Sequence, residues 1–267
     1  MIALFKKKES HQRSDPIACC GKLASYPEFI NLHQNNSVFI QIDQWFQSAY
    51  RYFVKQYGER AKVLLEKMSN YHCLRFDKRI EKPILISVFS SSDQGGRYYP
   101  FVISRILEHS MAKEFMTSIP LLYYDYIMTS EEFFKTVSTD SSLTNIHEKL
   151  LQYSKIDLKG SRLEILKKAY QLLSSKESTN EKEIQSIRLN SGQGIHLLIS
   201  QNENQLVKVS SCLQFFEKRK ILQENNWEMY WQTGNQYYSP SMFLFHQTLD
   251  EKEWSILINT DWENNEG

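Results

Sequence analysis

The sequence of 267 residues has four cysteines and none of the pairings in which cysteine usually acts as a metal ligand or a redox centre. Cys19 and Cys20 are adjacent, where a disulfide would be strained, and Cys73 and Cys212 stand alone. No C-x-x-C pair occurs, which argues against a zinc site or a thioredoxin-type site. We therefore expect four free thiols that serve as small core residues in a reducing compartment.

The sequence also lacks a charge excess and a long apolar run. Its 32 basic and 31 acidic residues give a net charge of +1, so no electrostatic argument favours nucleic acid or an anionic membrane as partner. No stretch reaches the roughly 18 apolar residues of a membrane-spanning helix, so we expect no membrane insertion. The apolar start, residues 1–5, precedes lysines 6–8, which reverses the order of a secretory signal. These features predict a cytoplasmic protein.

No complete catalytic set is present. The chain contains no G-x-S-x-G, H-E-x-x-H, Walker or Rossmann motif, and its seven histidines show no metal-ligand spacing. We therefore expect a protein that is not an enzyme, with no metal site and no cofactor.

What the chain does have is enough apolar and aromatic sequence for a packed core, 41% and 13% of its residues. The clearest helix is predicted from Ser37, as its cap, to Tyr57, with Gly58 just past its end. Its apolar residues recur every three or four positions, which predicts one face packed on a sheet. These residues are Val38, Ile42, Trp45, Ala49 and Phe53.

Strands and helices alternate along the rest of the chain. Strand patterns cover residues 17–22, 71–76, 84–89, 99–105, 184–189 and 195–200, and Lys82-Pro83 is interpreted as a turn. Helices are predicted at about 59–68, 109–117, 130–137, 142–152, 162–174, 211–225 and 250–258. A hairpin pairs 227–232 with 242–247 across Thr233-Gly234-Asn235, and its face of Trp227, Met229 and Trp231 is expected in the core.

The fold class follows from the connections. About ten residues join strands 84–89 and 99–105, which is too short for a parallel crossover. We therefore predict an α/β (α+β) fold with a central mixed or largely antiparallel sheet and helices on its faces. Residues 1–16 are expected to be a flexible lead-in to one domain of residues 17–262. That domain includes a helical middle section at about 106–173 and an exposed loop at about 174–183.

The most specified segment is the loop between those two strands, residues 90–100. It carries Asp93, two glycines, Arg97 and then Pro100, which fixes the exit of the loop. Two interpretations remain open: Asp93 and Arg97 form a structural ion pair, or the loop recognises an anion or a partner. A carboxylate held by a guanidinium is a poor general base, because its pKa falls.

Three spatial expectations follow. Gly21, Lys22 and Leu23 should lie near the Asp93–Arg97 loop, because both are tightly specified turns. Trp45 should be buried against the sheet while Asp43 is not. Arg97 should be chiefly a structural anchor, with Asp93, Asp43 or Glu28 as its acidic partner.

Four short segments resemble motifs of the TagF (ImpM) family of type VI secretion accessory proteins. Residues 21–30, GKLASYPEFI, are similar to the family's opening G-K-L-P-S-x-G-D-F, with Ala24, Pro27 and Glu28 as departures. The segment Asp43-x-Trp45 resembles its next signature, and residues 91–100 resemble its P-S-x-D-x-x-G-R-x-F-P block. Residues 230–234 and 242–244 resemble its W-W-x-x-G hairpin, whereas residues 106–190 match no motif.

The resemblance implies an α/β sandwich without enzymatic activity. It further implies a negative regulator that acts after translation on type VI secretion by binding a cytoplasmic protein, such as the forkhead-associated scaffold. The competing hypothesis is a small-molecule or anion-binding, enzyme-like module that uses the Asp93–Arg97 loop. The residues singled out as partner-binding or structural are Gly21, Lys22, Leu23, Glu28, Phe29, Asp43, Trp45, Asp93, Gly96, Arg97, Tyr98, Pro100, Trp231 and Gly234.

Overall fold

The structure is a computed structural model that describes residues 15–32, 35–77, 82–107, 116–140, 142–155, 185–188, 193–199, 205–218, 222, 227–245 and 247–258. Several predicted segments lie wholly or largely outside the described residues. They are the lead-in before residue 15, the helices at 109–117 and 162–174, and the loop at 174–183.

One sheet organises the described part of the chain, and its nine described strands run in the order β2-β1-β5-β4-β3-β8-β9-β7-β6. Every neighbouring pair in this sheet is antiparallel. The prediction of a largely antiparallel sheet in an α/β fold is therefore confirmed. The strands are β1 (Ile17–Leu23), β2 (Tyr26–Leu32), β3 (Tyr71–Asp77), β4 (Lys82–Phe89), β5 (Phe101–Ile106), β6 (Gln185–Arg188), β7 (Gln193–Leu198), β8 (Trp227–Gln232) and β9 (Ser241–Phe245).

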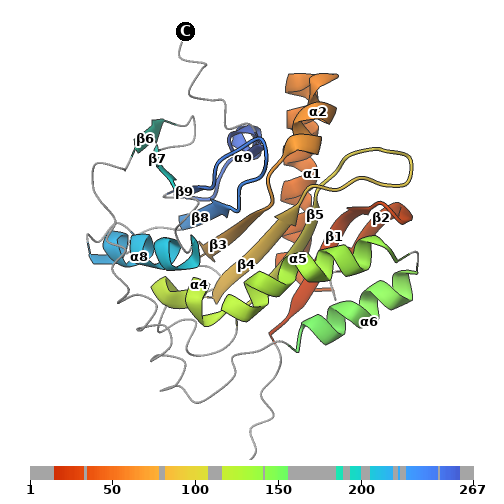
Figure 1. Cartoon of the computed structure of the whole chain (residues 1–267), viewed down its shortest axis with the longest axis horizontal. Helices are drawn as coiled ribbons and strands as arrows, with labels where there is room; N and C mark the ends of the chain where they lie inside the picture. The colour runs from red at the N-terminus through yellow and green to blue at the C-terminus, as the bar shows by residue number, and fades with distance from the viewer. Residues whose placement is uncertain are drawn as a thin grey trace, which may run out of the picture.

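Helices cover both faces of this sheet, which makes three layers (Figure 1). On one face lie α1 (Ser37–Tyr57), α2 (Arg60–Lys67) and the short pair η3 (Glu251–Glu253) and α9 (Ser255–Ile258). On the other lie η1 (Met116–Ser118), α4 (Ile119–Leu122), α5 (Tyr124–Ser138), α6 (Leu143–Tyr153) and α8 (Gln205–Lys218). The predicted helix at 250–258 is thus a 3-10 turn followed by one short helix.

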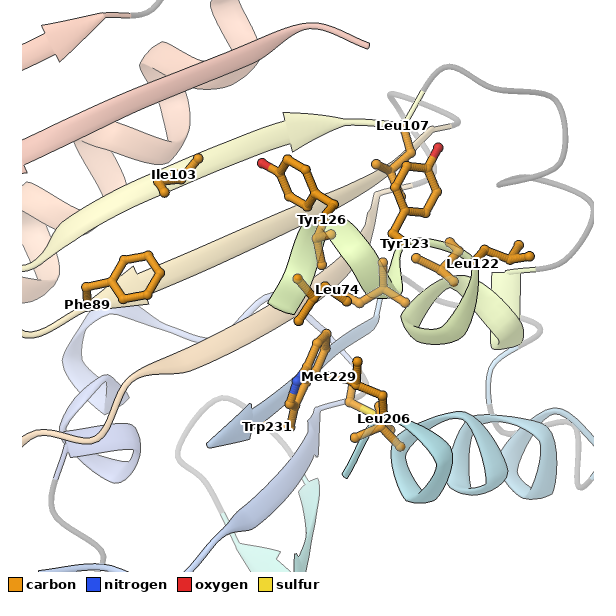
Figure 2. Packing of buried hydrophobic residues seen from close by; sticks show 14 of the residues in the cluster. Leu74, Phe89, Ile103, Leu107, Leu122, Tyr123, Tyr126, Leu206, Met229 and Trp231 are labelled. Carbon is orange, nitrogen blue, oxygen red and sulfur yellow. The ribbon is translucent and has the colours of Figure 1, made fainter. Parts of the chain in front are cut away.

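Successive strand residues pack alternately into two separate hydrophobic cores, one on each face of the sheet. Along β3, Cys73 belongs to the core under α1 and α2, whereas Leu74 belongs to the core under α5 and α8. On β8, Met229 and Trp231 pack into this second core, where Figure 2 shows them below α5 and beside Leu206 of α8. This period of two is what a strand buried on both faces produces.

The apolar stripe of α1 packs on the sheet as predicted. Ile42, Trp45, Ala49 and Phe53 are buried, and Val38 packs partly buried against the same core. The cap is Asn36 rather than Ser37, because the Asn36 side chain accepts a hydrogen bond from the amide of Val38.

Other elements also differ from the sequence prediction, and helix α5 begins at Tyr124 rather than at the predicted Ser130. Strand β2 has no clear apolar alternation and was not predicted; its pairing with β1 orders it. Lys82-Pro83 is the start of β4 and not a turn, since Pro83 is the first buried residue of a strand paired along its length with β3. Helix α8 begins at Gln205 and ends at Lys218, earlier at both ends than predicted.

The prediction of four unpaired thiols is confirmed. Cys19, Cys20, Cys73 and Cys212 are all free and buried. Burial raises the pKa of the Cys20 thiol, and the nearby carboxylate of Asp43 raises it further. Burial also raises the pKa of the Cys19 and Cys73 thiols, so these three thiols are protonated core residues rather than nucleophiles.

Candidate functional site

Antiparallel pairing brings three motif segments to the same end of the sheet. The ends of β1, β4 and β8 and the starts of β3 and β5 meet there. The segments that follow or flank those ends are the β1–β2 turn, the β4–β5 loop (residues 90–100) and the turn after β8. They are separated by up to about two hundred residues of sequence, and the sheet alone makes them neighbours.

The carboxylate of Asp93 is the centre of the β4–β5 loop. Its Oδ2 accepts hydrogen bonds from Lys22 Nζ at 2.6 Å and from Arg97 Nε at 2.7 Å. Its Oδ1 accepts from the amides of Gly95 and Arg97, both at 3.0 Å. One fully buried side chain therefore holds two cations and the backbone of a tight turn.

These bonds fix the charge of Asp93. The hydrogen bond from Lys22 is the main reason that the pKa of Asp93 lies well below its usual range. Burial would raise this pKa, but the hydrogen bonds from the Arg97 amide and side chain lower it further. Asp93 is therefore ionised at every pH at which the protein is expected to work. An anion with so low a pKa is a weak base, so this carboxylate suits anchoring rather than proton transfer.

The β1–β2 turn is tied to the same loop. Ser91 Oγ donates to the carbonyl of Lys22 at 2.6 Å, and Gln94 Nε2 donates to the carbonyl of Ser25 at 2.9 Å. Gly21 has a φ of +123°, and a Cβ there would lie 2.2 Å from the carbonyl oxygen of Pro100. Only glycine allows the backbones of residues 21 and 100 to come this close. The predicted proximity of residues 21–23 to the loop is therefore confirmed.

Arg97 is less of an anchor than the sequence suggested. Its side chain is 70% exposed, against 17% for Lys22 and 0% for Asp93. Within the described part of the chain its only side-chain bond is from Nε to Asp93, which leaves its Nη groups without a bond to a described residue. Lys22 is the sheltered partner of Asp93, and Glu28, the other expected acid, is exposed on β2.

Beneath the loop lies a small aromatic layer. Buried Tyr99 makes an edge contact with Phe29 at 5.0 Å and a tilted contact with Tyr50 at 4.8 Å. Burial raises the pKa of the Tyr99 phenol, which forms no hydrogen bond with any described residue. Tyr98 is half-buried at the surface, with Lys62 Nζ 6.0 Å from its ring centre. The layer supports the loop from below with rigid side chains.

The expectation for Asp43 is wrong, whereas that for Trp45 is confirmed. Asp43 is only 3% exposed, and its Oδ2 accepts from Asn31 Nδ2 and Gln47 Nε2 rather than turning outward. An acid was expected on the polar side of α1, but β2 closes over that side and supplies a donor. Trp45 is buried and donates from Nε1 to the carbonyl of Leu249 at 2.9 Å.

The third motif reaches the site through a residue that sequence reasoning missed. Asn70, just before β3, accepts at Oδ1 from the amide of Ser90 and at its carbonyl from the amide of Thr233. It thus joins the start of the β4–β5 loop to the turn after β8, where Gly234 adopts a φ of +73°. Trp231 itself is a core residue, with 1% of its surface exposed. The polar pair Ser69-Asn70 directly before a buried strand was the available signal.

Two kinds of feature are absent from the described residues, a metal-binding cluster and a membrane-spanning helix. Within these ranges no group of three or more His, Cys, Asp or Glu side chains could hold a metal ion. Among the helices that the structure describes, none combines the length and apolar character needed to cross a membrane.

Comparison with known families decides the assignment. The family model described as the TagF N-terminal domain, type VI secretion system-associated, matches residues 18–153, just over half of the chain. The chain belongs to this family. The matched TagF segment contains Gly21, Lys22, Asp93 and Arg97, whereas the hairpin with Trp231 lies beyond it.

Comparison of structures gives a weaker likeness. A crystal structure of PA0076 from Pseudomonas aeruginosa PAO1 aligns with 91% of this chain and 94% of its own, at 12% sequence identity and a TM-score of 0.48. No curated protein sequence matches the chain significantly.

Proposed function

We propose that this TagF-family chain is a non-enzymatic negative regulator of type VI secretion that acts after translation in the cytoplasm. In this proposal it binds a protein component of the system, such as the forkhead-associated scaffold, through the β4–β5 loop and the adjoining β1–β2 turn. Arg97 is the contact residue at the centre of that surface.

The observation that supports this role is the contrast within one ion-pair cluster. Asp93 and Lys22 are sheltered and hold the loop, while Arg97 is held at its backbone and Nε, is 70% exposed, and keeps its Nη groups without a bond to a described residue. A side chain that is fixed in place before binding loses little conformational entropy when it meets a partner. Arginine with a free planar fork is suited to carboxylate or phosphate groups on a protein surface.

The competing enzyme-like hypothesis receives no such support from the loop. Asp93 is the only acid in the loop, and its two oxygens already accept four hydrogen bonds. A catalytic base would have to break these bonds, and its lowered pKa makes it a poor proton acceptor. The arrangement fits a rigid recognition loop better.

The test uses Arg97→Ala and, as a matched control, Lys135→Ala, which removes an exposed cation from α5. We expect the free energy of unfolding of Arg97→Ala to lie within about 1 kcal/mol of the wild-type value, because exposed ion pairs contribute little to stability. In a strain that lacks the native copy, it should fail to repress secretion of a type VI substrate and should not co-purify the scaffold. Lys135→Ala should behave as wild type in both assays.

Arg97→Lys refines the test, since it keeps the charge and removes the planar fork. Partial repression by this variant would indicate that charge alone carries part of the contact. If Arg97→Ala folds normally and still represses secretion fully, the loop is not the binding surface and the proposal fails.

A further inference from the structure

A cavity of about 390 Å³ lies on the opposite side of the sheet end from α1, between α5 and α8. Its floor is formed by the cross-strand pair His72 and Trp231 on β3 and β8. Figure 2 shows Trp231 and Leu206, two of its lining residues, beneath α5. This volume is in the range of natural small-molecule sites.

The walls are mostly apolar and partly adaptable. Ile127 and Met128 line the cavity from α5, and Leu206 lines it from α8. Met128 is 55% exposed at the rim, where an unbranched side chain can adjust to different shapes. Gln205 Nε2 donates to the carbonyl of Thr233 at 3.1 Å and links α8 to the end of β8 beside the cavity.

His72 is a polar residue at a position of β3 that faces the core. Its Nδ1 lies 2.9 Å from Ser87 Oγ, and its ring lies 5.5 Å from that of Trp231. Ser87 is buried, and within the described chain the Nδ1 of His72 is the acceptor available to its hydroxyl. Donation by Ser87 places the ring proton on Nε2, which makes His72 a hydrogen-bond donor without a described protein partner.

The charged group of the cavity is acidic. Glu131 lines it from α5, and the only bond that this carboxylate makes to a described residue is a long one, 3.4 Å from Asn70 Nδ2. No lysine or arginine is among the lining residues that the structure describes. An anion would therefore meet repulsion, whereas a cation would be attracted by Glu131.

We propose that this cavity is a binding site for a small organic cation with an apolar ring and a hydrogen-bond acceptor. The ring packs between Trp231, Leu206 and Met128, the acceptor takes the Nε2 proton of His72, and the positive group lies near Glu131. Burial keeps His72 neutral at pH 7, with its pKa lowered to about 4, so it can play this donor role. The site is separate from the Arg97 surface and does not depend on the proposed regulatory function.

Two probes that share a ring and an amide carbonyl but differ in charge test the proposal on the full chain. At pH 6, L-phenylalaninamide is chiefly a cation, and N-acetyl-L-phenylalanine is an anion. In saturation-transfer NMR we expect the ring protons of L-phenylalaninamide to receive saturation. We expect an affinity at least about tenfold weaker for the anion, which corresponds to about 1.4 kcal/mol.

Variants locate the site. Met128→Trp fills the rim from an exposed position and should abolish the signal, while Leu151→Trp places the same side chain at an exposed position on α6 and should leave it intact. Glu131→Gln should reduce the preference for the cation. No signal from L-phenylalaninamide, equal binding of both probes, or a signal that survives in folded Met128→Trp would each overturn the proposal.

Discussion

Asp93→Ala is expected to lower the free energy of unfolding by about 2–4 kcal/mol, because it removes the acceptor that holds the β4–β5 loop. Lys22, 17% exposed, would lose its partner, and the amides of Gly95 and Arg97 would lose theirs. Urea unfolding at pH 7 measures the change. Arg97→Ala is the control in the same cluster, since it leaves Lys22 and Asp93 paired and should cost less than about 1 kcal/mol.

The Asp93 contribution should also depend on pH in a defined direction. The pKa of Asp93 is lowered in the folded state, so its stabilisation is complete above the unfolded value of about 3.9 and is lost as pH falls through the folded value. The difference between wild type and Asp93→Asn should therefore be constant from pH 7 to about 5 and shrink below about 4. A difference that grows on acidification would show that the carboxylate is not held as an ion.

Trp45→Ala is expected to lower the free energy of unfolding by about 3–5 kcal/mol, because it empties a large site between α1 and the sheet. The indole makes an edge contact with Phe46 at 4.9 Å, and the Arg75 guanidinium lies 5.8 Å from its ring centre. Its hydrogen bond to the carbonyl of Leu249 also holds the segment before α9 against α1. Denaturant unfolding followed by circular dichroism measures the loss.

Tyr52→Ala is the matched control for this change. It also truncates an aromatic side chain of α1, but Tyr52 is 43% exposed on the outer face of the helix. Its loss should therefore cost less than about 1 kcal/mol. A change below about 1 kcal/mol for Trp45→Ala would contradict the burial of that residue in the core.

Local signals were reliable where one element supplied its own pattern. The stripe of α1 and the position of Gly58 after its end are properties of consecutive residues, and both were predicted. The short link between β4 and β5 likewise excluded a parallel pair. Strand β2 could not be found this way, because Pro27 and Glu28 interrupt any apolar alternation and only its bonds to β1 order it.

The candidate site was predictable in part for the same reason. Asp93, Arg97 and the glycines stand within five residues, so their association is local. The dominant partner of Asp93 is Lys22, seventy-one residues away along the chain, and no spacing rule could reveal that it is more sheltered than Arg97. Asn70 and the cavity at His72 were missed because their roles arise from neighbours on other strands.

By itself, the sequence determined the class of fold, the unpaired thiols, the packing face of α1 and the presence of a tightly specified loop. Each of these depends on residue type and short spacing. Only the tertiary structure decided that Asp43 is buried, that Lys22 rather than Arg97 is the sheltered partner of Asp93, and that three distant motifs share one sheet end. Burial and charge pairing are set by which strands become neighbours, and that choice depends on the packing of the whole core.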